Sequence, residues 1–483
     1  MNELFVHINE FFDKILFFDI FFGLTDGKSF PFLIALMIFS GVYITFKMGF
    51  VNLRMFRHSF NIVRGRYRTA EDRGQITPFQ SLATALSATV GIGNIAAVSI
   101  AISIGGPGAA FWMIMAGFLG MSLKFTEVTL SLKYREFLPD GTILGGGMEY
   151  LSKGLAEKGW GTLGKYLAMV FAFFMILGAL GGGNTFQISQ ALGIMQQHIP
   201  FFETYPFVFG LLMAMITGMV IVGGIKRIAH VAEKIVPFMV VLYLLMVIWV
   251  LGVYFSEIPA AFKLIVSEAF NPTAAAGGVV GAMIQGFKRA IFSNEAGLGS
   301  AGIAHSTARV KYPIRQGLVS LYEPFIDTVV VCTMTALVVI LTGTYLGGTE
   351  LLDAAIQSNS GAVVTSTAFG SVVSWFPNVL GFAIFMFAFS TMISWSYYGE
   401  RAWVYLFGSK TSIIYKIIFL SFIVLATVVD TKIMVDFSFY LFLTLALPNI
   451  FGLIIMSGDV KKMLKEYTQK LKSGEFEKES LRD

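Results

Sequence analysis

The chain contains 483 residues, of which 55% are hydrophobic and 13% are charged, and its formal net charge is +5. This balance excludes a soluble globular protein, because repeated apolar runs of about 20 residues are typical of membrane-spanning helices. The single cysteine, Cys332, excludes a disulfide framework, and the basic residues are spread along the chain rather than gathered into a nucleic-acid patch.

The N-terminal residues 3–22 predict an amphipathic helix that lies in the membrane interface. Phe, Leu and Ile recur there at helical spacing, between the charged residues Glu10, Asp13, Lys14 and Asp19. Eleven apolar runs follow, and each is a candidate membrane span. They lie near residues 31–47, 78–104, 108–132, 163–192, 206–223, 232–255, 277–304, 318–346, 378–403, 413–429 and 434–456.

The positions of Lys and Arg predict the orientation of these spans. Cytoplasmic loops carry an excess of basic residues, and six arginines from Arg54 to Arg73 follow the first run. Alternation then puts most other basic residues on the same side, so we predict a multi-pass protein of the cell membrane with its N-terminus outside and its C-terminus in the cytoplasm. The outer loops receive Lys14, Lys28, Lys263 and Lys432. The inner loops and tail receive Arg135, Lys153, Lys158, Lys226, Arg227, Arg309, Lys311, Arg315, Lys410, Lys461, Lys462, Lys465, Lys470, Lys472 and Lys478.

The second run is interrupted at its centre. Residues 84–107 read TALSATVGIGNIAAVSIAISIGGP, with Gly91, Gly93 and Asn94 where a simple span would carry Leu, Ile or Val. Two glycines one residue apart lower the cost of leaving helical geometry, and backbone groups freed inside a membrane must find partners within the protein. Transporters use such broken helices to bind substrates and ions.

The seventh run repeats this feature. Residues 277–305 are interrupted by FSNEAGLG at 292–299, five spans after the first interruption. Because an odd number of helices reverses the direction of a repeat, one extra helix followed by five plus five helices predicts an inverted repeat with a site between the two broken helices. The alternative is that the glycines only allow close helix packing.

These features divide the chain into six predicted segments. The connections 256–276 and 347–377 mix apolar and polar residues, which fits either short helices over an extracellular mouth or surface loops. The segments are an extracellular or interfacial N-terminal segment (1–29), an additional membrane helix with a basic loop (30–76), the first repeat (77–255), an extracellular connection (256–276), the second repeat (277–457) and a basic cytoplasmic tail (458–483).

Three stretches closely resemble the alanine or glycine:cation symporters, also called sodium:alanine symporters. They are TPFQSLATALSATVGIGNIAAV at 77–98, GGPGAAFWMIMAGFLGMSLKFTEVTLSLKYRE at 105–136 and KRAIFSNEAGLGSA at 288–301, and the likeness extends to the tenth or eleventh run. The resemblance implies an all-α membrane protein with a leucine-transporter-type fold. It also implies sodium-coupled uptake of small neutral amino acids, mainly alanine or glycine.

A zwitterionic amino acid needs donors for its carboxylate and acceptors for its ammonium group. We expect N–H groups and a hydroxyl from the first break, and carbonyls and a hydroxyl from the second. Gln187 can donate and accept without burying a charge, with Asn184 and Gln190 as weaker alternatives, and Trp395 can close the pocket over a small side chain. The competing interpretations are a helix–helix hydrogen bond for Gln187 and an interfacial or packing role for Trp395. The predicted substrate-binding residues are Thr89, Gly91, Ile92, Gly93, Gln187, Phe292, Ser293, Gly297, Thr391 and Trp395.

Sodium needs hard oxygen ligands, which hydroxyls and carbonyls supply. The resemblance implies that the adjacent hydroxyls of Ser390 and Thr391 bind sodium together with the carbonyls of Ser87 and Val90. Asn94 is a candidate for a second, substrate-adjacent ion position. The alternative for the two hydroxyls is that each bonds to the preceding turn of its own helix.

Charged residues within apolar runs are costly and therefore need a role. Lys124 and Glu127 stand at i and i+3, and we predict that they pair. Glu295 lies in the second break, where it would organise the break or gate the inner exit. Glu323 and Asp327, at i and i+4, are the candidates for a proton-linked element.

The sequence thus predicts a symporter that works by alternating access. We expect its partners to be a small neutral amino acid, sodium and the lipid bilayer, with no nucleic acid, no obligate protein partner and no cofactor besides the coupling ion. No nucleophile–base pair or phosphate-binding loop is present, so we expect no enzyme. Two alternatives stay open, a proton-coupled amino-acid transporter and a membrane receptor or channel without coupled flux.

Overall fold

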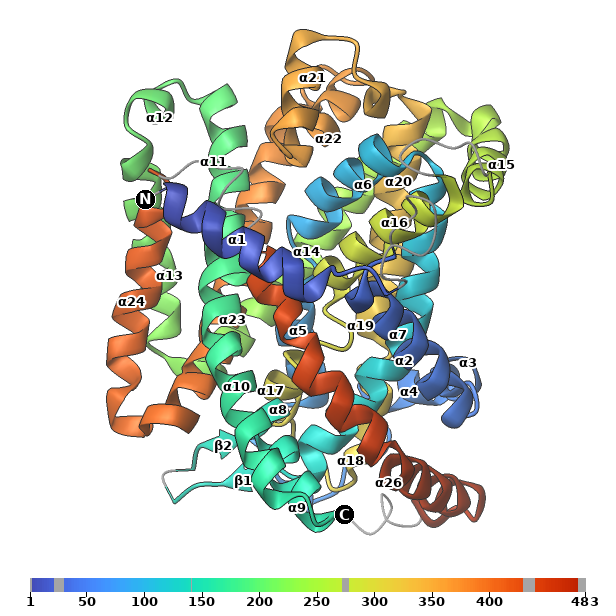
Figure 1. Ribbon diagram of the computed structural model, residues 1–483, viewed down its shortest axis with the longest axis vertical. Helices are drawn as coiled ribbons and strands as arrows, with labels where there is room; N and C mark the ends of the chain where they lie inside the picture. The colour runs from blue at the N-terminus through green and yellow to red at the C-terminus, as the bar shows by residue number, and fades with distance from the viewer. Residues whose placement is uncertain (1, 21–29, 140, 272–277, 429–438, 477–483) are drawn as a thin grey trace.

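The computed structural model describes residues 2–20, 30–139, 141–271, 278–428 and 439–476 of the chain. This part of the chain forms a bundle of helices that is elongated along the vertical axis of Figure 1. Several predicted features fall outside the described residues, namely Lys28, Lys432, Lys478, the end of the connection at 272–276, the first residue of the seventh run at 277 and the start of the eleventh run at 434–438.

The first half of the chain runs from α1 (Asn2–Leu16) to α14 (Gly224–Val253). It includes a small antiparallel hairpin of β1 (Glu136–Phe137) and β2 (Ile143–Leu144), in which Glu136 faces Leu144. The remaining elements are α2 (Phe32–Lys47), α3 (Val51–Arg54), α4 (Phe56–Val63), α5 (Pro78–Thr89), η1 (Gly93–Ala97), α6 (Val98–Gly105), α7 (Gly108–Lys133), α8 (Gly147–Glu149), η2 (Tyr150–Gly154), α9 (Leu155–Glu157), α10 (Gly161–Leu180), η3 (Gly181–Thr185), α11 (Phe186–His198), α12 (Phe201–Thr204) and α13 (Pro206–Ile221).

The second half runs from η4 (Phe255–Glu257) to α26 (Ala446–Lys472), which residues 439–444 precede in helical conformation. The elements between are α15 (Ile258–Ala269), α16 (Gly278–Asn294), α17 (Ala301–His305), α18 (Pro313–Val319), α19 (Tyr322–Pro324), η5 (Phe325–Cys332), α20 (Thr333–Leu341), η6 (Thr344–Leu346), α21 (Glu350–Gln357), α22 (Gly361–Gly370), α23 (Phe376–Phe407), η7 (Ser409–Thr411) and α24 (Ser412–Leu425).

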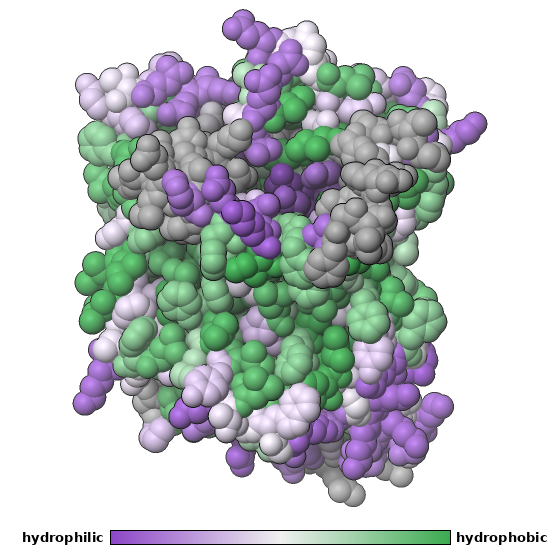
Figure 2. Space-filling view, in the orientation of Figure 1, coloured by the Kyte–Doolittle hydropathy of each residue, from purple (hydrophilic) through white to green (hydrophobic). Residues whose placement is uncertain are grey.

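The helices follow the predicted apolar runs, and among the described residues six helical segments are long and apolar enough to cross a membrane. The pair α5 and η1–α6 makes a seventh span if it is counted as one bent element. The helices α2, α13, α16 and α24 cover the other runs but have only 14 to 17 residues each, so the count of eleven spans stays a prediction. On the face in Figure 2, hydrophobic residues are densest in a zone below mid-height, and hydrophilic residues lie above this zone and at the lower end.

Exposed apolar side chains on α14 show why this chain needs a lipid environment. Phe238, Leu245 and Trp249 are 54%, 60% and 61% exposed and lie on the outside of the bundle. A soluble protein rarely leaves such large side chains in contact with water over a whole helix face. The same helix turns its buried Tyr243 inward, where its hydroxyl meets that of Thr335 at 2.6 Å.

The two long connections contain short helices rather than plain surface loops. The first holds η4 and α15, and the second holds α21 and α22, near the upper end of the bundle in Figure 1. The helix α22 is mostly buried and packs on η1, where the Thr365 hydroxyl donates to the Ile95 carbonyl at 3.0 Å. It therefore covers the second part of the first broken helix.

Three loops that were predicted on the cytoplasmic side meet at one end of the bundle. The guanidinium of Arg135 donates to the carbonyls of Ser306, Ala308, Arg73 and Val310 over 2.7–3.0 Å. Burial lowers the pKa of Arg135 to about 10, so its charge persists at neutral pH. The distribution of basic residues likewise predicts that these three loops lie on the same side of the membrane.

The predicted pair of Lys124 and Glu127 on α7 is wrong. The Lys124 ammonium lies 3.2 Å from Glu323 on α19, and both side chains are fully buried. The Glu127 carboxylate instead accepts the backbone N–H groups of Gly299 and Gly302, at 3.1 and 3.3 Å. The i, i+3 spacing allowed a pair, but the two side chains turn toward different neighbours of α7.

We expect removal of the Lys124 charge to destabilise the protein strongly. A Lys124→Met variant leaves Glu323 buried without its ammonium partner, although His305 still contacts it, and breaking a buried pair costs about 3–5 kcal/mol. The midpoint of thermal unfolding in detergent, followed by size-exclusion chromatography of heated samples, measures this loss.

The matched control is Lys133→Met, because Lys133 lies on the same helix α7 and pairs with Glu157 at 3.3 Å, and these two side chains are 28% and 57% exposed. Exposed pairs contribute only about 0–1 kcal/mol, so this variant should unfold close to the wild-type temperature. Equal stability of Lys124→Met and the wild type would show that the buried pair has no structural role.

Candidate functional site

The first broken helix departs from helical geometry where the two glycines predicted it. The helix α5 starts with a capping box, in which Thr77 and Gln80 exchange hydrogen bonds of 3.0 and 3.1 Å, and it ends at Thr89. Val90 has a ψ of 88°, and helical structure resumes at Gly93 with a bend of 50°. The broken segment is three residues long.

The second break follows α16 and is longer. Glu295, Gly297 and Gly299 have φ angles of 57°, 82° and 84°, and helical structure resumes at Ala301. Glycine adopts such angles readily, whereas they are uncommon for glutamate. The Glu295 carboxylate accepts the hydroxyl of Ser300 and the indole N–H of Trp395, the latter at 3.1 Å, so Glu295 organises the break.

The two breaks approach each other beside α11 and α23. A β-carbon added to Gly91 would lie 2.6 Å from the Thr391 hydroxyl oxygen and 3.5 Å from Oε1 of Gln187. A β-carbon added to Gly93 would lie 3.6 Å from the Cα atom of Ser293 and 3.8 Å from the Phe292 ring. The structure therefore gathers six predicted residues, namely Gly91, Gly93, Gln187, Phe292, Ser293 and Thr391.

Gln187 offers an unsatisfied polar atom to this junction. Its Nε2 donates to the Gly182 carbonyl in η3 at 3.0 Å, which fixes the amide orientation. Its Oε1 is buried and has no hydrogen-bond partner among the described residues. Buried polar atoms are almost always paired, so an unpaired acceptor that faces Gly91 is suited to a ligand donor.

Aromatic rings form a wall around the second break. Trp395 is 1% exposed, so it is not an interfacial residue, and its ring lies against Gly183 and 4.8 Å from that of Phe442. The Phe292 ring lies 5.1 Å from Phe442 and 4.8 Å from Phe186. Phe186 and Phe442 were missing from the sequence prediction, because an apolar ring in an apolar run carries no distinguishing signal.

Three of the predicted substrate-binding residues lie outside the group of six at the junction. The Thr89 hydroxyl bonds back to the Ala85 carbonyl at 3.3 Å, and Ile92 is a buried residue at the start of η1. The Gly297 carbonyl accepts the Asn449 amide at 2.8 Å, and a β-carbon there would meet Met37. Gly297 thus shapes the second break from its far side and does not join the other candidates.

The predicted sodium ligands from α5 and α23 lie together. The Thr391 hydroxyl donates to the Ser87 carbonyl at 3.1 Å, and the Ser87 hydroxyl donates to the Ser390 carbonyl at 2.5 Å. The Ser390 hydroxyl bonds to Phe387 of its own helix at 3.0 Å, as in the competing interpretation. Val90 follows directly at the end of α5, where its ψ turns the carbonyl out of the helix ladder.

A second polar cluster surrounds Asn94. Its Oδ1 accepts the Gly91 N–H at 2.8 Å, so that N–H group is already used, and its amide donates to Ser293 at 3.1 Å and to the Asp327 carboxylate at 2.5 Å. The other carboxylate oxygen of Asp327 accepts the hydroxyls of Ser293 and Thr328, at 2.9 and 2.7 Å. Asp327 is fully buried and forms no ion pair with a described residue. The sequence singled out Asp327 but not this contact.

The chain is similar to proteins of one family over nearly its whole length. The model of the sodium:alanine symporter family matches residues 18–481. The chain is 37% identical to the sodium/alanine symporter AgcS of Methanococcus maripaludis, over 91% of this chain and 94% of that protein. It is 34% identical to the probable sodium/glutamine symporter GlnT of Bacillus subtilis, over 92% of this chain and 89% of that protein. It is also 34% identical to the putative sodium/proton-dependent alanine carrier protein YrbD of Bacillus subtilis, over 77% of each chain.

Two solved structures have a similar fold. MhsT in complex with L-phenylalanine superposes with a TM-score of 0.56 at 14% identity, over 80% of this chain and 89% of MhsT. A manganese transporter of Eremococcus coleocola gives 0.53 at 12% identity, over 79% and 78%. This likeness shows a fold of the leucine-transporter type, whereas the inverted repeat stays a prediction. The resemblance read from the three sequence stretches is confirmed, and the chain belongs to the sodium:alanine symporter family of multi-pass membrane proteins.

Proposed function

We propose that the protein is a secondary active transporter that couples the uptake of small neutral amino acids, most of all alanine or glycine, to sodium. The observation that carries this proposal is the junction at Gly91, where both broken helices meet the unpaired Oε1 of Gln187 and the hydroxyl of Thr391. The relatives named for sodium and alanine or glutamine support the same class of cargo.

The junction supplies complementary groups for a zwitterion. The N–H groups of Ile92 and Gly93 stand at the start of a helix, where they have no intrahelical acceptor and favour a carboxylate. The Oε1 of Gln187 and the hydroxyl of Ser293 accept from an ammonium group. The rings of Phe186, Phe292 and Trp395 limit the space for a side chain, which favours a methyl group or a hydrogen atom.

Sodium has two places in this proposal. The first lies between α5 and α23, among oxygens of Ser87, Val90, Ser390 and Thr391. The second lies at Asn94 and the carboxylate of Asp327. A buried carboxylate without a cationic partner is costly, and sodium next to it would neutralise the charge. Thr391 and Asn94, one from each proposed sodium position, both contact the first break, which also binds the substrate in this proposal. Ion binding and substrate binding would therefore affect the same segment.

Coupling requires the ions to favour one state of the transporter over the other. In the proposed cycle sodium binds from outside and fixes the first broken helix, the amino acid then bridges both breaks, and release occurs to the cytoplasm. The N-terminus lies outside and the C-terminus lies inside the cell in this orientation.

Flux through proteoliposomes tests the proposed function. We expect uptake of labelled alanine with a sodium gradient and loss of uptake when choline replaces sodium at constant pH, and unlabelled glycine should compete. Equal uptake in choline would overturn sodium coupling, and saturable alanine binding without any flux would favour a receptor.

We expect a Gln187→Leu variant to lose affinity for alanine. Hydrogen bonds to a charged group contribute about 1.5–3 kcal/mol, so KM should rise by about 10- to 150-fold while the variant still reaches the membrane. Gln196→Leu is the comparison, because Gln196 lies on the same helix α11 and its amide donates to the Phe202 carbonyl on α12. An unchanged KM for Gln187→Leu would remove Gln187 from the site.

Proton coupling through Asp327 is the second candidate function. Its buried carboxylate, without an ion-pair partner among the described residues, favours this alternative, as does the relative named for sodium or protons. A pH gradient imposed without sodium separates the two, because only a proton-coupled transporter would accumulate alanine under that condition.

A further inference from the structure

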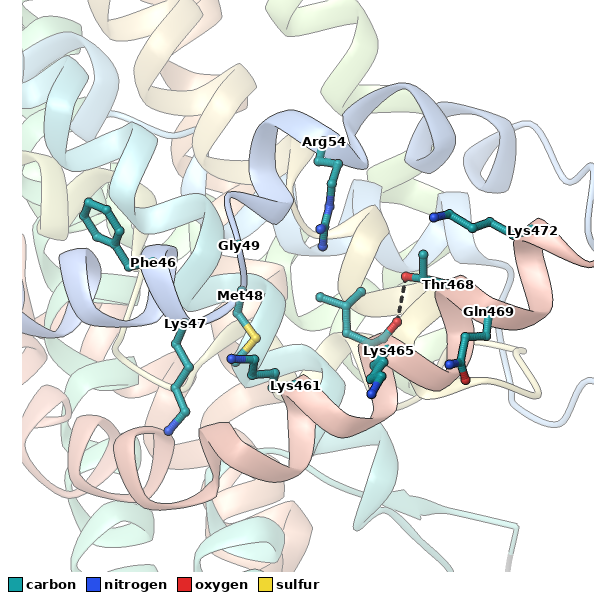
Figure 3. Close-up of a pocket in the computed structure, with 11 residues that line it drawn as sticks. Phe46, Lys47, Met48, Gly49, Arg54, Lys461, Lys465, Thr468, Gln469 and Lys472 are labelled. Atoms are coloured by element: carbon teal, nitrogen blue, oxygen red, sulfur yellow. Dashed lines mark hydrogen bonds between the residues drawn. The ribbon is translucent and has the colours of Figure 1, made fainter.

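A basic cleft lies between the end of α2 and the C-terminal half of α26. It has a volume of about 430 Å³, and its eleven lining residues include five cations and no carboxylate (Figure 3). The cations are Lys47, Arg54, Lys461, Lys465 and Lys472. This cleft is separate from the junction of the broken helices and lies on the side where the sequence predicts cytoplasm.

The cations converge on the cleft because of their positions on the helices. Lys461, Lys465, Thr468 and Lys472 stand at i, i+4, i+7 and i+11 of α26, and therefore share one face. Figure 3 shows Arg54 extending from α3 toward this face of α26. Like charges at i and i+4 repel each other, so an anion between them would stabilise this arrangement.

The protein does not neutralise these charges itself. The Lys47 ammonium donates to the Tyr43 hydroxyl at 2.6 Å, and none of the five cations forms an ion pair with another described residue. Other lysines nearby do form pairs, since Lys158 lies 2.8 Å from Asp459 and Lys470 lies 2.7 Å from Glu475. The five cations that face the cleft thus lack a carboxylate partner among the described residues.

An apolar surface leads into the cleft. Phe39, Val42 and Phe46 stand at i, i+3 and i+7 of the apolar helix α2 and are 60%, 37% and 66% exposed. Exposed rings on a membrane helix contact acyl chains, and Phe46 also lines the cleft together with Leu464. An occupant that matches both parts of the cleft carries a negative charge and a hydrocarbon chain.

We propose that this cleft binds an anionic phospholipid, with its phosphate among Arg54, Lys461 and Lys465 and its acyl chains along the exposed face of α2. Basic pockets between membrane helices on the cytoplasmic side suit such headgroups, and each basic residue near the surface adds roughly fivefold to the affinity. The proposal does not depend on the transported substrate.

The test uses the purified full-length protein in neutral detergent, with lipid added as mixed micelles. We expect phosphatidylglycerol to raise the thermal unfolding midpoint in a saturable manner, and phosphatidylcholine to do so far less. In a Lys461→Gln/Lys465→Gln variant, the concentration of phosphatidylglycerol at half effect should rise by about 25-fold. In an Arg54→Gln variant this concentration should rise about fivefold, and this variant provides the test if the double variant folds poorly.

The matched control is Lys462→Gln/Lys470→Gln, which removes the same charge from α26 at residues that do not line the cleft. It should respond to phosphatidylglycerol as the wild type does. An equal loss in both double variants would mean that only the overall charge matters, and an equal response to phosphatidylcholine would remove the preference for anionic lipid. Inorganic phosphate that reproduced the full shift would mean that the cleft takes a free anion, and the lipid proposal would be wrong.

Discussion

A Gly91→Ala variant should lose most sodium-dependent alanine uptake, although it gains only a methyl group. The new β-carbon would lie 2.6 Å from the Thr391 hydroxyl oxygen, which is closer than real contacts allow. Thr391 would have to move, and it would give up its hydrogen bond to the Ser87 carbonyl. Overpacking of this kind costs about 1–3 kcal/mol, which corresponds to a five- to 150-fold loss in apparent sodium affinity.

Two glycine variants make this prediction specific. A β-carbon on Gly93 would meet only ordinary contacts of 3.6 Å or more, so Gly93→Ala should impair uptake less than Gly91→Ala. A β-carbon on Gly193 in α11 would meet open space, so Gly193→Ala should match the wild type. The dependence of alanine uptake on sodium concentration in proteoliposomes measures the effect of all three substitutions. Wild-type behaviour of Gly91→Ala would contradict the packing of the first break against Thr391.

The second large effect is expected for Asp327→Asn. This change keeps the shape of the side chain and removes the charge that the proposed second sodium ion would neutralise. Loss of the charge-assisted contacts with Asn94 and Ser293 should lower apparent sodium affinity by tenfold or more and reduce uptake accordingly.

Asp353→Asn is the comparison for this variant, because Asp353 is an exposed residue of α21 that accepts a hydrogen bond from Gly348. It should leave uptake unchanged. If Asp327→Asn kept its sodium dependence but lost a pH dependence present in the wild type, the carboxylate would carry a proton, and the second ion position would be wrong.

The sequence predicted the breaks because glycine pairs have a local effect on backbone geometry. Gly91 lies inside the first interruption and Gly93 directly follows it, and Gly297 and Gly299 adopt positive φ angles in the second. The family resemblance rested on the same stretches. Local patterns of this kind are visible in one segment and need no knowledge of its neighbours.

The partners of polar groups could not be predicted in the same way. Lys124 reaches Glu323, nearly 200 residues away along the chain, and Asn94 reaches Asp327 over a separation of 233 residues. Which side of a helix faces which neighbour depends on packing, which spacing within one helix does not contain. For the same reason, the sequence did not predict that the Phe442 ring packs beside the second break or that Gly297 lies apart from the other candidate residues.

The central claim is that one junction of two broken helices holds the amino acid and sodium together. Calorimetric titration of alanine into the purified protein tests it most directly, once with sodium and once with choline at equal ionic strength. We expect alanine to bind at least tenfold more tightly with sodium than with choline, and sodium to bind more tightly by the same factor with alanine, because such coupling is reciprocal. Alanine affinity that is equal in sodium and choline would contradict it.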